Sequence, residues 1–583
     1  MLKEIPEDPV LCEQWNTLVQ QVEQPEVFYT YEWALAVQRA YKTLLPPLVL
    51  LGYDSDEKLI GVVAFAEDDR RKTASFLSAS TGDYCDFISE PGRRGEFVSA
   101  VFSELQKRGI ENAVFTNLPV DSATFAAIRK EAPSQRFRYY ARTAYICAQV
   151  EFSGLEVKKD GNRVAPGLKR LRRFEKAMAS DPVRTEHLRS WETVEPILSE
   201  LFRAHVARFL EVGRLSNLAN PDRQLFLQEL AYLLSMRNWL VVSRMLTGSM
   251  PVAWHFGFQF HNKWFWYQPT FNSSVEKHWP GFCLLSQVIQ DALQIPSLNV
   301  LDLGLGAEAY KAKFANASRE TLHVTLSTSL ARHWAVMLRH RCVELVRSSP
   351  RREKIADSLR QSLRRLGARI RKNGVARTSW WMMKRLFRRI WGKTEVHFFK
   401  GSFSEYATQG HDVLLNPLTL KHLAEAAMVF NDDEEACAYL VRSAKRLRSS
   451  EAEGWVLTDT KGQPLHFAWV AQFNGFYCAE LDSALNASEG SVLIFDCWTP
   501  DALRGNGYYE QCISLLGSRI QASGRDPWIF SATSNTPSMK GIEKAGYEFR
   551  YSMICKYRFG QHKTVPGTSC APELSVEEVA TRP

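Results

Sequence analysis

A chain of 583 residues is longer than one hydrophobic core usually supports, so the sequence predicts several domains. Hydrophobic residues make up 45% of the chain and charged residues 23%, a balance that excludes a disordered or collagen-like protein. No run of about 18 uncharged apolar residues occurs, and the first residues lack a basic-then-apolar signal pattern. We therefore expect a cytoplasmic protein without a spanning helix.

The positive charge is concentrated in one segment, although the whole chain carries only +9. Between Arg332 and Lys393 there are nineteen Lys and Arg residues against three acids, so the remainder of the chain is net acidic. The eleven cysteines are scattered and form no C-x-x-C or Cys/His cluster at zinc spacing. We expect free thiols, no disulfide framework and no structural metal.

Apolar periodicity predicts an α/β protein with mixed central sheets. Residues 15–41 have helical periodicity, residues 46–69 resemble two strands around a polar turn, and residues 239–271 contain three strand-like runs. The predicted segments are two α/β halves, a basic helical linker, a third α/β unit and a disordered tail. Their boundaries are 1–150, 151–330, 331–394, 395–560 and 561–583.

The stretch "TPDALRGNGYYEQ" (499–511) lies between an apolar strand-like run and a helical pattern. Its glycines allow either a plain strand-to-helix turn or a cradle in which amides at a helix start bind an anion. Arg504 would add a charge-assisted hydrogen bond to such an anion. The glycines alone do not decide between these interpretations.

The context of this stretch resembles the GCN5-related N-acetyltransferases (GNAT). A strand meander leads into Arg504-x-x-Gly507, a helix, a strand and then "SATSNTPSMKGIEKAGYEF", where Asn535, Ser538, Lys544, Gly546 and Tyr547 match the second family motif. The resemblance implies an acetyl-CoA site, with the pantetheine arm between parallel strands that separate after Ile494–Trp498 and Trp528–Ser531. The residues it assigns to the donor are Trp498, Arg504, Gly505, Asn506, Gly507, Tyr508, Asn535, Ser538 and Lys544.

Two positions depart from the family pattern. Tyr509 replaces a small residue of the phosphate turn, and Ile542 replaces the tyrosine that the family uses as general acid. The resemblance then leaves Tyr508, Tyr509, Tyr547 or a water as proton donor, of which Tyr547 is our catalytic candidate. Glu480, in the strand-like run "FYCAEL", is either a general base acting through a water or an exposed strand residue.

Residues 10–325 resemble the CelD-type proteins of cellulose and exopolysaccharide operons, which are related to the FemAB aminoacyl transferases. The ordered pieces include "GDYCDF", "LKRLRRFEK", "GSMPVAWHFGF" and "LDLGLGAEAYKAKFA". The resemblance implies two GNAT-like modules that form a FemAB-like pair. With the third unit, the chain would contain three acyl-CoA N-acyltransferase-like modules.

No single motif identifies the catalytic chemistry of this N-terminal part. His205 and Arg208 share one helix face, which makes His205 a catalytic and Arg208 a substrate-binding candidate. Asp302, Glu308, Tyr310 and Lys311 follow a strand, where α/β sites tend to lie. The alternatives are a surface pair and a salt-bridged turn.

The stretch 378–393 alternates aromatic and basic residues, and as a helix it would align Trp380, Met383, Phe387 and Trp391. Such a helix can lie on an anionic membrane surface, or it can pack between domains. Nucleic acid is a weaker interpretation because the sequence has no recognisable fold for it.

Together these observations predict a cytoplasmic N-acyltransferase and leave peripheral contact with the inner face of the membrane open. Its donor would be acetyl-CoA or another acyl-CoA, without a metal. Family resemblance implies an amino sugar, or a polysaccharide or cell-envelope precursor, as a small-molecule or lipid-linked acceptor. Two alternatives remain open: an aminoacyl or long-chain acyl transferase that uses aminoacyl-tRNA or acyl-carrier protein, and an inactive scaffold for polysaccharide synthesis. The sequence leaves the oligomeric state open.

Overall fold

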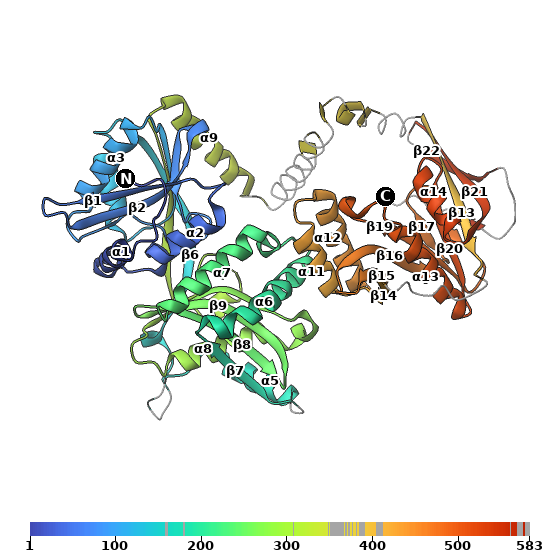
Figure 1. The fold of residues 1–583 in the computed structure, drawn as a ribbon, viewed down its shortest axis with the longest axis horizontal. Helices are drawn as coiled ribbons and strands as arrows, with labels where there is room; N and C mark the ends of the chain where they lie inside the picture. Colours follow the sequence, from blue (N-terminus) through green and yellow to red (C-terminus); the bar gives the residue numbers. More distant parts are fainter. Residues whose placement is uncertain are drawn as a thin grey trace. The chain divides into compact units, whose positions relative to one another are not determined.

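The computed structural model describes residues 1–157, 161, 163–178, 181–306, 308–347, 349, 366–367, 370, 374–375, 377–380, 382–383, 391–403, 412–449, 451–559, 561–567 and 575–577. Its contacts divide it into two compact units (Figure 1). The first contains Met1–Arg208 and Asn220–Glu353, and the second contains Phe209–Ala219 and Lys354–Pro583. No helix among the described residues is long and apolar enough to cross a membrane.

The first unit is built on one twelve-stranded mixed sheet, as far as the described residues extend. The strand order is β1-β2-β3-β5-β12-β6-β11-β10-β9-β8-β7, with β4 paired to β2. The strands are β1 (Pro47–Tyr53), β2 (Leu59–Asp68), β3 (Thr73–Phe76), β4 (Ile88–Ser89), β5 (Asn112–Pro119), β6 (Arg138–Glu151), β7 (Val183–Leu188), β8 (Leu240–Thr247), β9 (Met250–Phe260), β10 (Lys263–Phe271), β11 (Val300–Asp302) and β12 (Ala317–Ser327). The helices are α1 (Pro9–Gln21), α2 (Tyr31–Tyr41), α3 (Arg94–Lys107), α4 (Ala123–Glu131), α5 (Leu168–Ala177), α6 (Trp191–Glu211), α7 (Pro221–Met236), α8 (Pro280–Ala292) and α9 (Leu330–Arg347).

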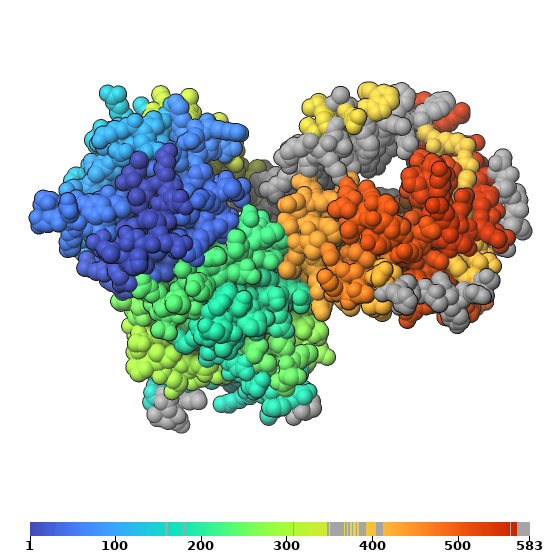
Figure 2. Space-filling model, in the orientation of Figure 1, coloured from blue at the N-terminus to red at the C-terminus, as the bar shows by residue number. Residues whose placement is uncertain are grey.

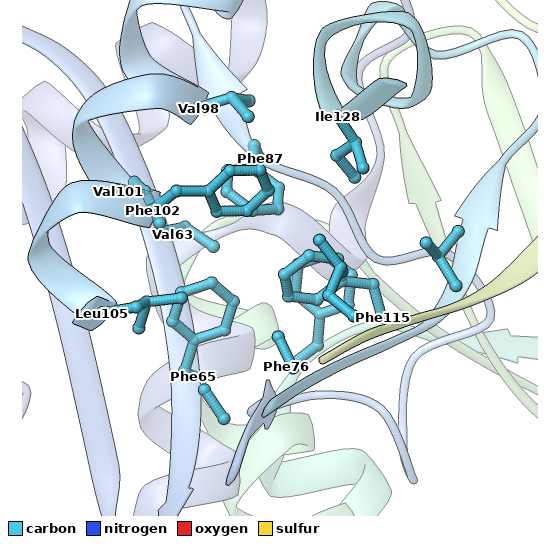
Figure 3. Packing of buried hydrophobic residues seen from close by; sticks show 14 of the residues in the cluster. Val63, Phe65, Phe76, Phe87, Val98, Val101, Phe102, Leu105, Phe115 and Ile128 are labelled. Atoms are coloured by element: carbon cyan, nitrogen blue, oxygen red, sulfur yellow. The ribbon is translucent and has the colours of Figure 1, made fainter. Parts of the chain in front are cut away.

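Local patterns account for the first part of this sheet. The hairpin expected at residues 46–69 is confirmed, because β1 and β2 pair antiparallel from Pro47↔Ala66 to Tyr53↔Leu59. One face of α3 places apolar residues at helical spacing against the aromatic side chains of the sheet. Figure 3 shows this packing, in which the labelled residues include Phe65, Phe76, Phe87, Val98, Val101, Phe102, Leu105 and Phe115. All of them are buried, beneath the surface that Figure 2 draws for this unit.

The two predicted halves of the first unit share strands. β12, which belongs to the second half by sequence, lies between β5 and β6 and pairs antiparallel with both. β6 lies between β12 and β11, and it pairs with β11 through Gln149–Glu151. The predicted boundary at residue 150 therefore falls inside a strand of one continuous sheet.

The second unit has an eight-stranded sheet in the order β14-β15-β16-β19-β20-β13-β21-β22 and a small sheet β17-β18-β23, counted over the described residues. Its strands are β13 (Trp391–Gly401), β14 (Val413–Pro417), β15 (Glu453–Asp459), β16 (Pro464–Gln472), β17 (Phe476–Cys478), β18 (Ser483–Asn486), β19 (Ser491–Trp498), β20 (Asp526–Ala532), β21 (Tyr547–Arg558), β22 (Gln561–Pro566) and β23 (Ser575–Glu577). Its helices are α11 (Leu420–Val429), α12 (Glu434–Ser449), α13 (Tyr508–Ala522) and α14 (Thr536–Lys544).

The structure corrects three expectations about the linker and the tail. α9, at the start of the predicted linker, packs on the first unit, where the His340 ring stacks 5.4 Å from Tyr140. Trp391 lies on β13 rather than on a helix, because pairing with β21 from Trp391↔Arg558 onward overrides the local helical pattern. Residues 378–380 and 382–383 are helical, whereas Phe387 lies outside the described residues. The tail expected to be disordered contains β22, which pairs with β21, and β23, which pairs with β18.

Candidate functional site

A pair of parallel strands separates in the second unit, inside the ranges 494–498 and 528–531 after which the family resemblance placed the separation. β19 and β20 pair from Ser491↔Asp526 to Ile494↔Ile529, and this ladder then stops. Beyond it, β19 stays paired to β16 up to Trp498, and β20 stays paired to β13 up to Ala532. The two strands therefore diverge, and the backbone of Phe495–Trp498 on that side has no ladder to β20.

A β-bulge marks the same point of β19. Asp496 and Cys497 together oppose Ala468 of β16, and Asp496 has φ of +47°. A bulge re-aims the backbone and ends regular pairing. The Asp496 carboxylate accepts a hydrogen bond from Arg446 Nη1 at 2.6 Å, and its carbonyl accepts one from Tyr439 Oη at 3.1 Å. These bonds hold the bulge in place.

The turn after β19 ends in an open helix N-terminus. Gly507 has φ of +78° at the N-cap of α13 and provides no side-chain cap, so the first amides of α13 keep their donors available. A Cβ built on Gly505 or Gly507 would meet nothing within 4 Å, which leaves room for close approach of a ligand. The turn thus has the chemistry of an anion cradle.

Side chains of this turn hold it in shape. Arg504 Nη1 lies 2.7 Å from Asp501 Oδ1, its Nε donates to the Thr499 carbonyl at 3.2 Å, and its side chain is 56% exposed. Asn506 Nδ2 donates to the Leu503 carbonyl at 3.1 Å. Tyr508, the first residue of α13, is partly buried.

The remaining predicted donor residues are only partly brought together. Asn535 caps α14 by accepting from the Ser538 amide at 3.4 Å, and Ser538 Oγ lies 3.0 Å from Tyr509 Oη. Lys544 is exposed in the last turn of α14, about 13.5 Å along the helix from Asn535 at 1.5 Å per residue. The Trp498 ring stacks on Tyr439 at 4.6 Å.

Two predicted catalytic residues of this unit lie elsewhere than expected. Glu480 is an exposed residue in the turn after β17, and β17 belongs to the small sheet rather than to the eight-stranded one. Its position on a strand was therefore predicted wrongly, because a short apolar run does not reveal which sheet it joins. The Tyr547 hydroxyl donates to the Ile513 carbonyl at 2.8 Å in the core, and burial raises the pKa of Tyr547 well above its usual range.

Tyr509 is the phenol that the structure places against α14. Its ring packs against Gly541, where an added Cβ would stand 2.9 Å from Tyr509 Cδ1. Its ring centroid also lies 5.6 Å from that of His466 on β16. Ile542 is fully buried in the adjacent core. Burial raises the pKa of Tyr509, so its hydroxyl keeps its proton at neutral pH.

The first unit repeats this geometry at β10 and β11. They pair in parallel from Lys263↔Val300 to Phe265↔Asp302, and the ladder stops there. Trp266 and Tyr267 together oppose Gly257 of β9, which is the same bulge. Downstream, Trp279 has φ of +59° at the N-cap of α8 and provides no side-chain cap. In both respects it is like Gly507 at the N-cap of α13.

A buried histidine accompanies each bulge, and neither was predicted from the sequence. His255 Nε2 bonds to the Phe265 carbonyl at 3.0 Å, and His466 Nδ1 bonds to Thr499 Oγ1 at 2.7 Å. Burial lowers the pKa of each imidazole to about 3, so both are neutral near pH 7. The shared strings "HFGF" and "HFAW" were the available signal.

His205 and Arg208 reach this part of the first unit from α6. His205 is buried and its Nε2 accepts a hydrogen bond from Gln268 Nε2 at 2.7 Å, just past the bulge. Burial and the cations Arg208 and Arg223 lower the pKa of His205 to about 3. The Arg208 guanidinium lies 4.3 Å over the Phe271 ring, and burial lowers its pKa.

The predicted residues after β11 shape a loop. Asp302 is buried and accepts bonds from Tyr84 Oη at 2.7 Å, Gln149 Nε2 at 2.8 Å and the Gly304 amide at 2.8 Å. Lys311 is also buried and donates to the Leu305 carbonyl at 2.6 Å. Its partner Glu308, at 2.9 Å, is 57% exposed. Burial raises the pKa of Tyr310 to about 12.

Asp83 is a functional candidate of this unit that was not predicted from the sequence. It is partly buried, bonds the Leu305 amide and lies against Gly304, where an added Cβ would stand 2.5 Å from Asp83 Oδ2. Burial, with the neighbouring Asp302, raises its pKa to about 7. The string "GDYCDF" contains Asp83, but no motif distinguishes it from other loop acids.

Comparisons with known proteins agree with this geometry. Residues 167–312 match the model of the family described as an acetyltransferase (GNAT) domain. No curated protein sequence matches the chain.

Solved structures similar to this chain include L-PGS from Bacillus licheniformis, with 11% identity, a TM-score of 0.38, and coverage of 58% of this chain and 98% of that one. FemX has 7% identity, a TM-score of 0.39, and coverage of 54% and 95%. A tandem GNAT protein from the clavulanic acid biosynthesis pathway has 11% identity, a TM-score of 0.33, and coverage of 55% and 96%. Sequence identities and TM-scores this low support no conclusion about function.

The matched residues contain β10, β11 and α8, the elements that form the bulge, the diverging strands and the open helix start in the first unit. The expected resemblance to GNAT proteins is confirmed over these residues. Residues 167–312 are therefore similar to a GNAT acetyltransferase domain.

Proposed function

We propose that this protein transfers an acyl group, acetyl in the simplest case, from an acyl-CoA thioester to an amine. The observation that carries the proposal is the repeated set of three features around β10–β11 and β19–β20. In both places a parallel ladder stops, a bulge lies beside the stop, and a following helix begins at a residue with positive φ and without a side-chain cap.

The residues present fit the donor. The open start of α13, with Gly505 and Gly507 beside it, would hold the pyrophosphate, and the released backbone of β19 would hold the pantetheine arm. When bound, acyl-CoA supplies an activated carbonyl and a thiolate leaving group. Backbone amides at the bulge would stabilise negative charge on the thioester oxygen. Among the described residues no cluster of His, Cys, Asp and Glu could hold a metal ion.

Asp83 fits the role of general base in the first unit. The amine nitrogen would form a bond to the acyl carbon as the carbon–sulfur bond breaks, and the amine proton would pass to the Asp83 carboxylate. A pKa of about 7 suits this task, because the group is largely ionised just above neutral pH and still accepts a proton. His205 is neutral, and with Gln268 it would position the amine rather than carry charge.

In the second unit, Tyr509 fits the role of general acid. Its protonated hydroxyl, beside Ser538, would give a proton to the leaving thiolate. This assignment replaces Tyr547, whose hydroxyl is bonded to the Ile513 carbonyl.

The acceptor in this proposal is an amino sugar or another polysaccharide or cell-envelope precursor with a free amine, either a small molecule or lipid-linked. The support is the CelD-type sequence resemblance of residues 10–325. An aminoacyl-tRNA or acyl-carrier protein donor is tested by the same assay.

A second candidate for the second unit alone is a binding module without catalysis. The observation that favours it is the displacement of Glu480 into the turn after β17, which leaves this unit without the predicted base. In that case the second unit would bind CoA, and the first would catalyse transfer.

The test is calorimetric titration of acetyl-CoA into the full chain and two charge variants. Asn506→Asp places a negative charge at the α13 turn, and Gly281→Asp places one in the first turn of α8. The added Cβ of Gly281→Asp would stand 3.1 Å from Phe271 Cδ1, so thermal unfolding first verifies that this variant folds. Asn474→Asp is the matched control, because it lies in the exposed turn after β16, at the opposite end of β19.

We expect each site variant to lose one class of binding site and the control to bind like the native protein. Thioester turnover is then measured with a panel of amines and with acetyl-CoA, acyl-carrier protein and aminoacyl-tRNA as donors. Native protein that binds no CoA and turns over no donor would contradict the proposal. Turnover abolished by Gly281→Asp but not by Asn506→Asp would assign catalysis to the first unit and binding to the second.

A further inference from the structure

The exposed side of α9 carries an apolar row. Leu330, Trp334 and Leu338 lie four residues apart and are 54%, 60% and 66% exposed. A spacing of four places side chains on one helix face. Large apolar groups aligned in this way differ from the scattered exposed residues found on most surfaces.

The opposite side of α9 is attached to the first unit, along which the helix lies (Figure 1). His340 stacks on Tyr140 and lies 6.0 Å from His323, and the side chains of Val336 and Val343 are partly buried. The helix is therefore held on the unit by one face while the apolar row points away from it. The row is a fixed surface of a folded unit.

Positive charge accompanies the apolar row. Arg332, Arg339 and Arg341 are exposed on α9, with Arg332 Nη2 also donating to Thr73 Oγ1 at 3.5 Å, and Glu344 is its only acid. Residues 348–390, which follow in the sequence, contain fourteen Lys and Arg against two acids. Covering the row with that segment, or with α9 of a second copy, would bring like charges together. An anionic bilayer complements both the charge and the apolar row.

We propose that α9 is a membrane-contact helix which docks the first unit on an anionic lipid surface. Trp334 and the two leucines would enter the boundary between headgroups and acyl chains, and the arginines would contact lipid phosphates. This surface differs from the one expected at residues 378–393 and does not depend on the proposed acyl transfer.

The test is flotation of the full-length protein with phosphatidylcholine vesicles, with and without phosphatidylglycerol. We expect flotation with the anionic vesicles only, weakened by salt. Replacing Leu330, Trp334 and Leu338 by Ser should lower partitioning about tenfold or more, because apolar burial is lost. Arg332, Arg339 and Arg341→Gln should also lower it and reduce the salt dependence. The control replaces Val10, Leu44 and Met236, which are equally exposed, by Ser.

Cys342 provides a direct reporter, because it continues the apolar row by four residues and is the exposed cysteine among those described. An environment-sensitive dye on Cys342 should shift to the blue with anionic vesicles and not with neutral ones. Thermal unfolding of every variant verifies folding. Native protein that fails to float, or a folded Ser variant that floats equally well, would overturn the proposal. So would loss of self-association in the Ser variant without any vesicle binding by the native protein.

Discussion

Gly304 makes room for Asp83: a Cβ at Gly304 would stand 2.5 Å from Asp83 Oδ2, and Gly304 has φ of +70°. We therefore expect Gly304→Ala to displace the Asp83 carboxylate and strain the loop, with a loss of turnover of about tenfold or more. The measurement is kcat/KM with the best amine. The control is Gly95→Ala on α3, where an added Cβ meets nothing within 4 Å. Equal activity of both variants would remove Asp83 from the mechanism.

Asp83→Asn should abolish the rise of kcat/KM with pH near neutrality. In the native protein kcat/KM should rise with pH through about 7, as the carboxyl ionises. The variant should lose about 10²-fold or more and show no such step. Asp56→Asn, in the exposed β1–β2 turn, is the control. If the rise of kcat/KM with pH persists in Asp83→Asn, the ionisation of a group other than Asp83 causes it.

The contribution of Asp83 to the free energy of unfolding should fall as pH rises, whereas its contribution to activity should increase. The folded pKa of about 7 lies above the usual 3.8, so between these values the folded state holds a proton that the unfolded state releases. The contribution to stability is complete below pH 3.8 and is lost as pH rises through about 7. Asp83→Asn should therefore raise Tm relative to the native protein above about pH 7 and change it little in acid. A Tm difference that does not vary with pH would contradict the shift.

Removing the hydroxyl of Tyr509 should affect catalysis, whereas removing that of Tyr547 should affect stability. If the second unit catalyses transfer, Tyr509→Phe should reduce kcat about 10²-fold, because the leaving thiolate loses its proton donor. Tyr547→Phe should leave kcat unchanged and cost about 1 kcal/mol, because only the bond to the Ile513 carbonyl is lost. Urea unfolding and turnover of the two variants decide this. The reverse pattern would restore Tyr547 as the acid.

Lys311 and Glu308 form one ion pair but should differ in their effect on stability. Lys311→Met leaves the Leu305 carbonyl without its buried cationic donor and should cost about 2–4 kcal/mol. Glu308→Gln removes a 57% exposed partner and should cost less than about 1 kcal/mol. Denaturant unfolding of the first unit measures both costs. Similar values would mean that the ion pair, rather than the bond to the loop, holds Lys311.

The local geometry of the second-unit site was predictable from its sequence. The run ending at Trp498, the turn through Gly507 and the helix after it follow consecutively along the chain, so each element fixes the start of the next. Glycine and helix-start signals are local properties of the chain. The same reasoning located the hairpin of β1 and β2.

Side-chain assignments that depend on distant pairing were not predictable. Asp83 acquires its environment from Asp302 and Leu305, which lie far along the sequence. Glu480 depends on which sheet β17 joins, and Trp391 on its pairing with Arg558. Periodicity gives the face of a strand but not its neighbours.

The return of β12 between β5 and β6 has a consequence for how the chain folds during synthesis. When the ribosome has released residues 1–150, both β5 and β6 still lack the partner that residues 317–327 will provide. Unpaired strand edges are prone to wrong pairing, so the early chain has to be protected or remain unstructured until that late strand emerges. A nascent protein halted before residue 317 should bind chaperones, whereas one halted well after residue 327 should be released.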